Sequence, residues 1–363
     1  MFASAGVRIA RIPRGPLFIN NFLQRNLFNV SKRYFVSDTY ASSQGYHSGS
    51  GQSGSQSGSQ SNGQQTTNNT TGPFTYKTTV AYQPKDREDA IYQKLKDSLL
   101  SPTGEDNYFI TTNSVSDVYA GVADGVGGWA EHGYDSSAIS RELCKAMDQL
   151  SASLTTDLSK SKQDQNSTVT PKKIIDLSYN KIKEEKIVEV GGTTAIVAHF
   201  PQDGLLKVAN LGDSWCGVFR DSKLVFQTKF QTVGFNAPYQ LSIIPEEMER
   251  EARLSGRSYI QNTPKDSDEY EFQLKSKDVI MLATDGVTDN IATGDIELFL
   301  KDNQDLLSND MNKTSKTLVQ NVVKLSKDPE YPSVFAQEIS KLTGKLYKGG
   351  KEDDITLVLV KVD

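Results

Sequence analysis

The chain has 363 residues, of which 36% are hydrophobic and 23% charged, and its formal net charge is −5. This acidic balance, with no stripe of basic and aromatic residues, argues against nucleic acid as the main partner. The length suits two domains, or one domain of roughly 250 to 300 residues with tails. Two cysteines indicate a reducing compartment without a disulfide framework. Three histidines leave little material for a histidine-rich metal site or a Ser-His-Asp triad.

The N-terminal region is basic and contains no acidic residue before Asp38. Arginines and lysines scattered among Phe, Leu, Ile, Ser and Asn are typical of a mitochondrial transit peptide, which we predict over residues 1–37. A basic tail that lacks acids by chance is the alternative. Residues 38–73 are rich in Ser, Gly, Gln and Asn, which predicts a disordered linker. No run of about 18 apolar residues occurs, so we expect no transmembrane helix.

Residues 74–363 are expected to form one folded domain. Runs rich in Val, Ile, Thr and aromatic residues predict strands at 74–80, 107–112, 117–122, 193–200, 205–211, 215–220, 223–228, 278–283 and 354–362. Helical periodicity predicts helices at 135–154, 172–185, 293–300 and 313–327. Because strands come in blocks, we predict an α+β fold with antiparallel sheets and helices outside. Residues 155–171 are expected to be a surface insertion, and 231–270 an irregular segment of a functional or disordered kind.

Acidic residues recur at the ends of the predicted strands. These residues are Glu105, Asp106, Asp124, Asp285, Asp289, Asp353 and Asp354. Carboxylates held together repel one another unless a divalent cation neutralises them or some take up protons. Oxygen ligands favour a hard cation such as Mg²⁺ or Mn²⁺, and two ions about 3.5–4 Å apart can activate water and hold phosphate. A single Asp-Gly pair is a common turn, but several at strand ends in a fixed order indicate a site.

Six segments in a fixed order resemble the type 2C metal-dependent serine/threonine protein phosphatase family. They read GEDNYF, VADGVGGW, GGTTAIVA, VANLGDSWCGVF, MLATDGVTDNI and GGKEDDITLVLV. Together with GFNAPYQLSIIP and the basic N-terminus, they are most similar to the mitochondrial branch. The resemblance covers nearly all of residues 74–363. It implies a four-layer αββα sandwich of two central antiparallel sheets flanked by helices, with a two-metal centre at one end.

The resemblance also implies a metal-ligand set. Asp124 resembles the carboxylate that bridges two Mg²⁺ or Mn²⁺ ions per subunit, and Gly125 the residue whose backbone carbonyl binds one of them. Asp285 and Asp353 resemble the remaining carboxylate ligands of the pair. Asp289 resembles a ligand of a weaker third ion.

Two further acids and three departures from the family pattern complete the predicted site. Glu105 and Asp106 resemble the acids that order metal-bound waters, so with Asp124 they form the predicted catalytic set. Asp354 stands where the family usually has Asn, which leaves open whether it or its neighbour faces the metal. Val126 stands where many members carry a histidine that protonates the leaving group. No arginine occurs at 99–104, where many members carry a phosphate clamp.

The predicted function is a mitochondrial phosphatase that hydrolyses phosphoserine and phosphothreonine on matrix proteins, with ubiquinone biosynthesis as one pathway that the branch implies. A catalytically weak pseudophosphatase that binds and regulates a partner is one alternative, and a small-metabolite phosphohydrolase is another. Cysteine chemistry is excluded because no arginine stands six positions after Cys144 or Cys216. His132 is the nearby substitute for the missing acid, although we expect an ordinary loop histidine. The sequence gives no oligomeric state.

Overall fold

A computed structural model describes residues 7–8, 73–87, 101–157 and 169–363. Almost all of the predicted transit peptide, nearly all of the linker and most of the predicted insertion lie outside these residues. No helix in the described ranges is long and apolar enough to cross a membrane.

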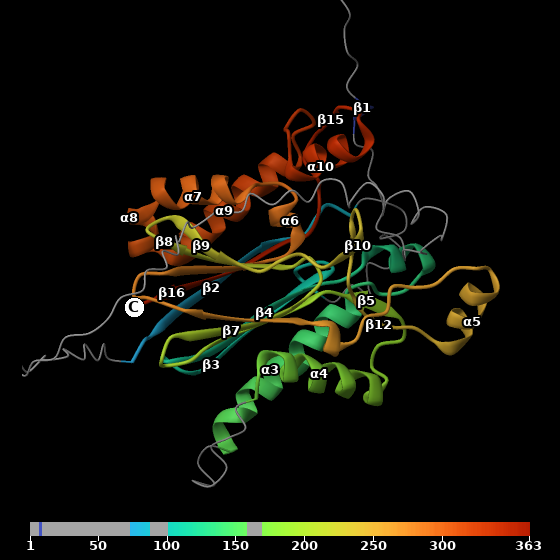
Figure 1. The fold of residues 1–363 in the computed structure, drawn as a ribbon, viewed down its shortest axis with the longest axis horizontal. Coiled ribbons are helices and arrows are strands. Elements are labelled where there is room, and N and C mark those ends of the chain that lie inside the picture. The colour runs from blue at the N-terminus through green and yellow to red at the C-terminus, as the bar shows by residue number, and fades with distance from the viewer. Residues whose placement is uncertain (1–6, 9–72, 88–100, 158–168) are drawn as a thin grey trace, which may run out of the picture.

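Two five-stranded antiparallel sheets form the centre of the described domain (Figure 1). The strand order is β13-β7-β6-β4-β3 in the first sheet and β2-β16-β14-β8-β9 in the second. The first sheet consists of β3 (Asp106–Ser114), β4 (Asp117–Asp124), β6 (Ala195–Phe200), β7 (Leu205–Leu211) and β13 (Asp268–Gln273). The second consists of β2 (Tyr76–Gln83), β8 (Trp215–Arg220), β9 (Lys223–Gln227), β14 (Val279–Ala283) and β16 (Ile355–Val362).

The sheets pack face to face through one apolar cluster. Val122 and Ile196 from the first sheet meet Leu282 and Val358 from the second, and all four are fully buried. The central strands read as nearly continuous apolar runs because each has a second layer on its other face.

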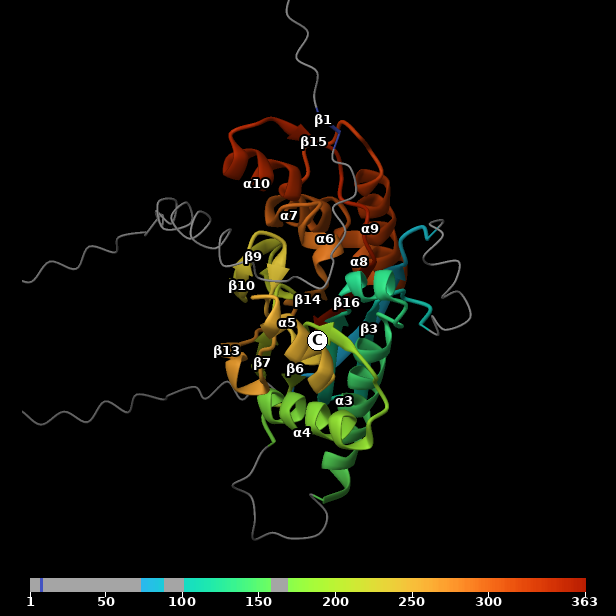
Figure 2. The same ribbon diagram turned by 90° about the vertical axis from the view of Figure 1, so that its right-hand side faces the viewer.

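Helices cover both outer faces, as Figure 2 shows in a view turned by 90°. The first sheet carries α3 (Ala138–Asp157) and α4 (Pro171–Glu185). The second carries α7 (Thr293–Asp302), α8 (Gln304–Asn309) and α9 (Met311–Ser326). The C-terminal part of the chain also forms three short elements: α6 (Asp285–Thr288), α10 (Val334–Thr343) and β15 (Tyr347–Lys348). Strand β15 pairs with β1 (Val7–Arg8). The predicted α+β class and four-layer αββα sandwich are therefore confirmed.

Each strand and helix expected within the domain is present, but the expectation that 231–270 is irregular was wrong. This segment forms β10 (Thr232–Gly234), β11 (Ala237–Pro238), β12 (Leu241–Ile243), α5 (Glu246–Leu254), η2 (Pro264–Asp266) and the start of β13. The edge strand β13 alternates exposed with half-buried residues. Phe272 stacks on Phe226, and Tyr270 meets the same ring edge-on. An edge strand with charged residues on its outer face has no continuous apolar run, so a search for such runs does not detect it. In Figure 1, α5 and the pair of β12 with β5 (Gly191–Thr193) lie at the end of the sandwich away from the C-terminus.

Candidate metal centre

The strand ends bring the acidic segments to one end of the sandwich. Asp106 begins β3 and Asp124 ends β4, and the antiparallel register sets the two opposite each other. Asp285 directly follows β14, and Asp353 and Asp354 directly precede β16, which is the neighbour of β14. Adjacent antiparallel strands place the end of one beside the start of the next, so the acids of each pair lie at the same end of their sheet. We call this end of the sandwich the acidic edge.

Hydrogen bonds join the two sheets at this edge. The Thr284 hydroxyl donates to Oδ2 of Asp106 over 2.7 Å, and the backbone N–H of Glu105 donates to Oδ2 of Asp354 over 2.8 Å. The predicted acids from both sheets therefore form one cluster. Its fully buried members are Glu105, Asp106, Asp124, Asp285 and Asp354.

The Gly-Gly-Thr-Thr motif fixes the backbone of Asp124. The Thr193 hydroxyl and the Thr194 N–H both donate to its carbonyl oxygen, over 3.0 and 2.9 Å, and its own N–H donates to the Thr194 hydroxyl over 3.0 Å. That hydroxyl is 2.8 Å from the hydroxyl of Ser214. The motif thus positions the Asp124 backbone, and the Asp124 carboxylate is not needed for these bonds.

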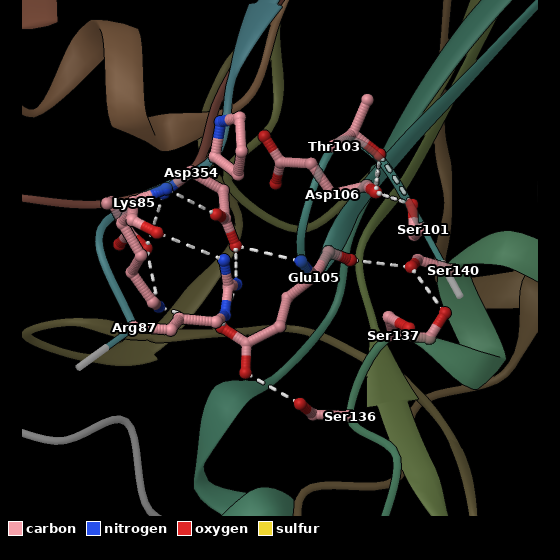
Figure 3. Close-up of polar contacts among 12 residues, drawn as sticks. Lys85, Arg87, Ser101, Thr103, Glu105, Asp106, Ser136, Ser137, Ser140 and Asp354 are labelled. Carbon is pink, nitrogen blue, oxygen red and sulfur yellow. Dashed lines mark hydrogen bonds and ion pairs between the residues drawn. The ribbon is translucent and has the colours of Figure 1, made fainter. Parts of the chain in front are cut away.

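Two basic side chains from the segment after β2 enter the cluster (Figure 3). Lys85 Nζ lies 2.7 Å from Oε2 of Glu105 and 3.1 Å from Oδ1 of Asp353. Arg87 Nη2 lies 2.5 Å from Oδ2 of Asp354 and 3.4 Å from Oε2 of Glu105. Neither residue was predicted from the sequence, where an arginine was expected just before Glu105. The signal that would have found them is a pair of basic residues soon after β2, which is the neighbour of β16 in the second sheet.

A third cation, Lys351, contacts the acids that follow β14 and precede β16. Lys351 Nζ is 2.7 Å from Oδ2 of Asp285 and 3.3 Å from Oδ2 of Asp353, and it also contacts Oδ2 of Asp289. Its side chain is 11% exposed. No group of three or more His, Cys, Asp or Glu side chains within the described ranges is arranged to hold a metal ion. In this structure the carboxylates contact lysine and arginine nitrogens and do not converge on a single position for an ion.

Burial and charge shift the pKa values of the buried acids in opposite directions. Burial is the largest cause that raises the pKa of Asp106 well above its ordinary value, and like charge from Asp124 and Asp354 adds to it. Burial also opposes ionisation of Glu105, but cations led by Lys85 hold its pKa below the ordinary value. At Asp106 burial and like charge therefore outweigh the nearby cations, whereas at Glu105 the cations outweigh burial.

The donor set fits a hard divalent cation. Seven carboxylates meet three cationic side chains at this edge, and no histidine or cysteine contributes a donor. Such an excess of oxygen donors and negative charge is the chemistry that Mg²⁺ and Mn²⁺ prefer. Glycines keep the backbone close to the acids: a Cβ on Gly127 would lie 2.8 Å from Oε2 of Glu105, and one on Gly125 would lie 2.7 Å from its carbonyl oxygen.

Val126 and His132, the two positions considered for the missing proton donor, follow the Asp124-Gly125 turn. Val126 is buried in an apolar cluster with Trp129 and Val190. His132 ends the short helix η1 (Gly127–His132) as an exposed residue, and its ring centroid is 6.4 Å from that of Trp129. The aliphatic side chain of Val126 cannot donate a proton. The valine supports the packing of neighbouring segments instead.

Comparisons with known proteins agree with the fold. Residues 114–363 match the family model described as Stage II sporulation protein E (SpoIIE). The chain is 64% identical, over all of both chains, to the Saccharomyces cerevisiae protein named Protein phosphatase 2C homolog 7, mitochondrial. It is 34% identical to Protein phosphatase PTC7 homolog of Danio rerio, over 70% of this chain and 80% of that one. The solved photosystem II phosphatase PBCP has the same fold, with a TM-score of 0.59 and 24% identity over 79% of this chain and 99% of its own.

The sandwich and these relatives together define a protein serine/threonine phosphatase. The chain belongs to the type 2C metal-dependent protein phosphatase family, as its motifs predicted. The yeast relative's name supports a mitochondrial location.

Proposed function

We propose that this phosphatase acts in the mitochondrial matrix on phosphoserine and phosphothreonine of proteins, with two divalent cations bound at the acidic edge. The observation that carries the proposal is the convergence of Asp106, Asp124, Asp285 and Asp353 from four strand ends in a chain of this family. The weak pseudophosphatase is disfavoured because every predicted carboxylate is present.

The proposed ligands of the two Mg²⁺ or Mn²⁺ ions are Asp124, Asp285 and Asp353, with the Gly125 carbonyl. Asp289, which is 26% exposed, is the proposed ligand of a weaker third ion. When bound, the ions supply an activated water and positive charge for the phosphate oxygens.

The contacts of the two neighbouring acids support Asp353, rather than Asp354, as the ligand. Asp354 accepts hydrogen bonds from the backbone N–H groups of Lys85 and Glu105 and pairs with Arg87, so it is held in place by backbone donors and a half-buried guanidinium. Asp353 contacts the Nζ atoms of two lysines, which are flexible groups that a metal can replace. Asp354 is then a positioning residue.

Glu105 and Asp106 are the proposed residues that orient the attacking water, and Arg87 and Lys85 the proposed phosphate-binding groups. A planar guanidinium binds phosphate oxygens in pairs, and an ammonium binds them as a point charge. These residues supply, from an earlier part of the chain, the positive charge that residues 99–104 lack. The lack of an arginine at 99–104 is therefore no reason to expect slow turnover.

A protein substrate is favoured over a small metabolite by the segment that borders the site. Asn236, between β10 and β11, places its Oδ1 atom 3.3 Å from Nζ of Lys351. The same segment carries α5 at the end of the sandwich, where Leu254 is 82% exposed. A folded projection beside an acidic site offers contacts to residues around a phosphorylated side chain. Within the matrix, enzymes of ubiquinone biosynthesis are the proposed substrate group, on the resemblance to the mitochondrial branch.

Hydrolysis of p-nitrophenyl phosphate and of a phosphothreonine peptide by the full-length protein, with and without Mn²⁺, tests this function. We expect metal-dependent turnover of both, and faster turnover per unit concentration of the peptide. Absence of metal-dependent turnover on either substrate contradicts the phosphatase assignment. Turnover of the small ester with none of the peptide favours the metabolite alternative.

A further inference from the structure

The backbone of Lys351 is held so that its side chain enters the acidic cluster. Its N–H donates to Oδ1 of Asn290 over 2.9 Å, and its carbonyl accepts from Nδ2 of the same residue over 2.9 Å. Asn290 is fully buried, and its Nδ2 also donates to the carbonyl of Gly286. This arrangement ties the loop before β16 to the turn that follows Asp285.

The ammonium group of Lys351 is surrounded by the groups that a bound cation needs. Carboxylate oxygens of Asp285, Asp289 and Asp353 lie around it, and Oδ1 of Asn236 is 3.3 Å away. On another side, Nζ lies 5.2 Å from the ring centroid of Phe335. A cation over an aromatic face and beside three carboxylates is held electrostatically by the ring and by the acids.

We propose that Lys351 is an internal cation that competes with the divalent metal for Asp285, Asp289 and Asp353, an inference that rests on the proposed metal site. A carboxylate oxygen bound to Mg²⁺ lies about 2.1 Å from the ion, and Mn²⁺ also carries two positive charges. An ammonium within hydrogen-bond distance of the same oxygens would then face a close double charge without shielding water. Lys351 therefore holds the acids together before the metal binds and leaves when the metal arrives. The enzyme consequently needs a higher metal concentration for binding than the same ligands would need without Lys351.

Calorimetric titration of full-length protein with MnCl₂ measures this competition directly. Lys351→Met keeps the length of the side chain without the charge. Lys345→Met is the control, because Lys345 is an exposed lysine between α10 and β15. We expect Lys351→Met to bind Mn²⁺ about tenfold more tightly than wild type, which corresponds to about 1.4 kcal/mol. The control should match wild type. Binding by Lys351→Met that is unchanged or weaker overturns the proposal.

Amine labelling shows whether Mn²⁺ displaces the Lys351 ammonium or whether the lysine only weakens metal binding through its charge. The experiment uses the wild-type protein and so does not depend on the folding of a variant. N-hydroxysuccinimidyl acetate is added with and without Mn²⁺, and mass spectrometry measures acetylation at Lys351 and Lys345. We expect Mn²⁺ to raise acetylation of Lys351 several-fold, because the ammonium moves out of its buried position, and to leave Lys345 unchanged. Acetylation of Lys351 that stays constant or falls contradicts displacement, even if the methionine variant binds metal more tightly.

Turnover measured in parallel distinguishes the two proposals. Mn²⁺ binding with displacement of Lys351, but without hydrolysis of any phosphoester, supports the competition and contradicts the proposed function. Metal-dependent hydrolysis without displacement contradicts the competition alone. If Mn²⁺ binds to neither wild type nor Lys351→Met, both the metal site and the competition are wrong.

Discussion

Replacement of Gly286 by alanine should both destabilise the protein and disturb its acidic edge. A Cβ at this position would lie 1.9 Å from the carbonyl oxygen of Asp354 and 3.1 Å from Cγ1 of Ile355. The first contact is with backbone, which cannot rotate away as a flexible side chain can. Overpacking costs about 1–3 kcal/mol, and we expect the upper end here, offset by about 0.4–1 kcal/mol from the lower entropy of the unfolded alanine chain. The net loss is about 2 kcal/mol, or about 4–8 °C in Tm.

Gly294→Ala is the matched control for Gly286→Ala. Gly294 lies in the first turn of α7, and a Cβ there meets no atom within 4 Å. The control should be neutral or more stable by up to about 1 kcal/mol. Differential scanning calorimetry compares both variants with wild type, and a peptide assay should show a loss of about 100-fold for Gly286→Ala, because Asp285 and Asp354 shift. Equal melting temperatures for the two variants would refute this reading of the turn.

Three further substitutions or conditions test other parts of the structure. Arg87→Met should raise KM for a phosphothreonine peptide by about tenfold or more, because a charge-assisted phosphate contact is lost; an unchanged KM argues against the clamp. Arg220→Met should cost about 2–4 kcal/mol in urea unfolding, since the fully buried Asp278 then loses partners at 2.7 and 2.8 Å, and a loss under 0.5 kcal/mol contradicts this. A hydrogen bond from His199 holds the pKa of Asp117 below its ordinary value, so its stabilisation is present above about pH 4 and is lost as pH falls below that. His199→Phe keeps a ring beside Tyr119 but cannot donate to Asp117, so urea unfolding should show a flatter loss of stability between about pH 5 and pH 3. An identical slope speaks against the pair.

The sandwich and the acidic edge were predictable because both follow from local patterns. Apolar runs of five to eight residues that end in Asp-Gly, as at Val279–Ala283 before Asp285, give a strand and the position of its carboxylate together. Antiparallel pairing then brings such ends together without further information. The edge strand β13 was missed because its alternation of Tyr270 and Phe272 with acids is short and weak beside the charged residues around it.

The contacts of the three cationic side chains in the cluster were not predictable from local patterns. Lys85 is far from Asp353 in the chain and reaches it because β2 and β16 are neighbours in the second sheet. Lys351 is close to Asp353 in the chain, but its contacts with Asp285 and Asp289 depend on the fold. Long flexible side chains can reach the same point from many backbone positions, so residue spacing does not determine which acids they contact. The role of Val126 was equally hidden, since its burial depends on packing with Val190 from a distant segment.

Mn²⁺-dependent hydrolysis of a phosphothreonine peptide by Asp124→Asn is the most direct test of the proposed metal centre. Backbone atoms, not the Asp124 carboxylate, make the hydrogen bonds to Thr193 and Thr194, so the variant should keep the circular dichroism spectrum of wild type. We expect kcat/KM to fall about 1000-fold or more, which is about 4 kcal/mol of transition-state stabilisation, with a similar fall for Asp285→Asn. Near-normal turnover by both folded variants would contradict a metal site at this edge.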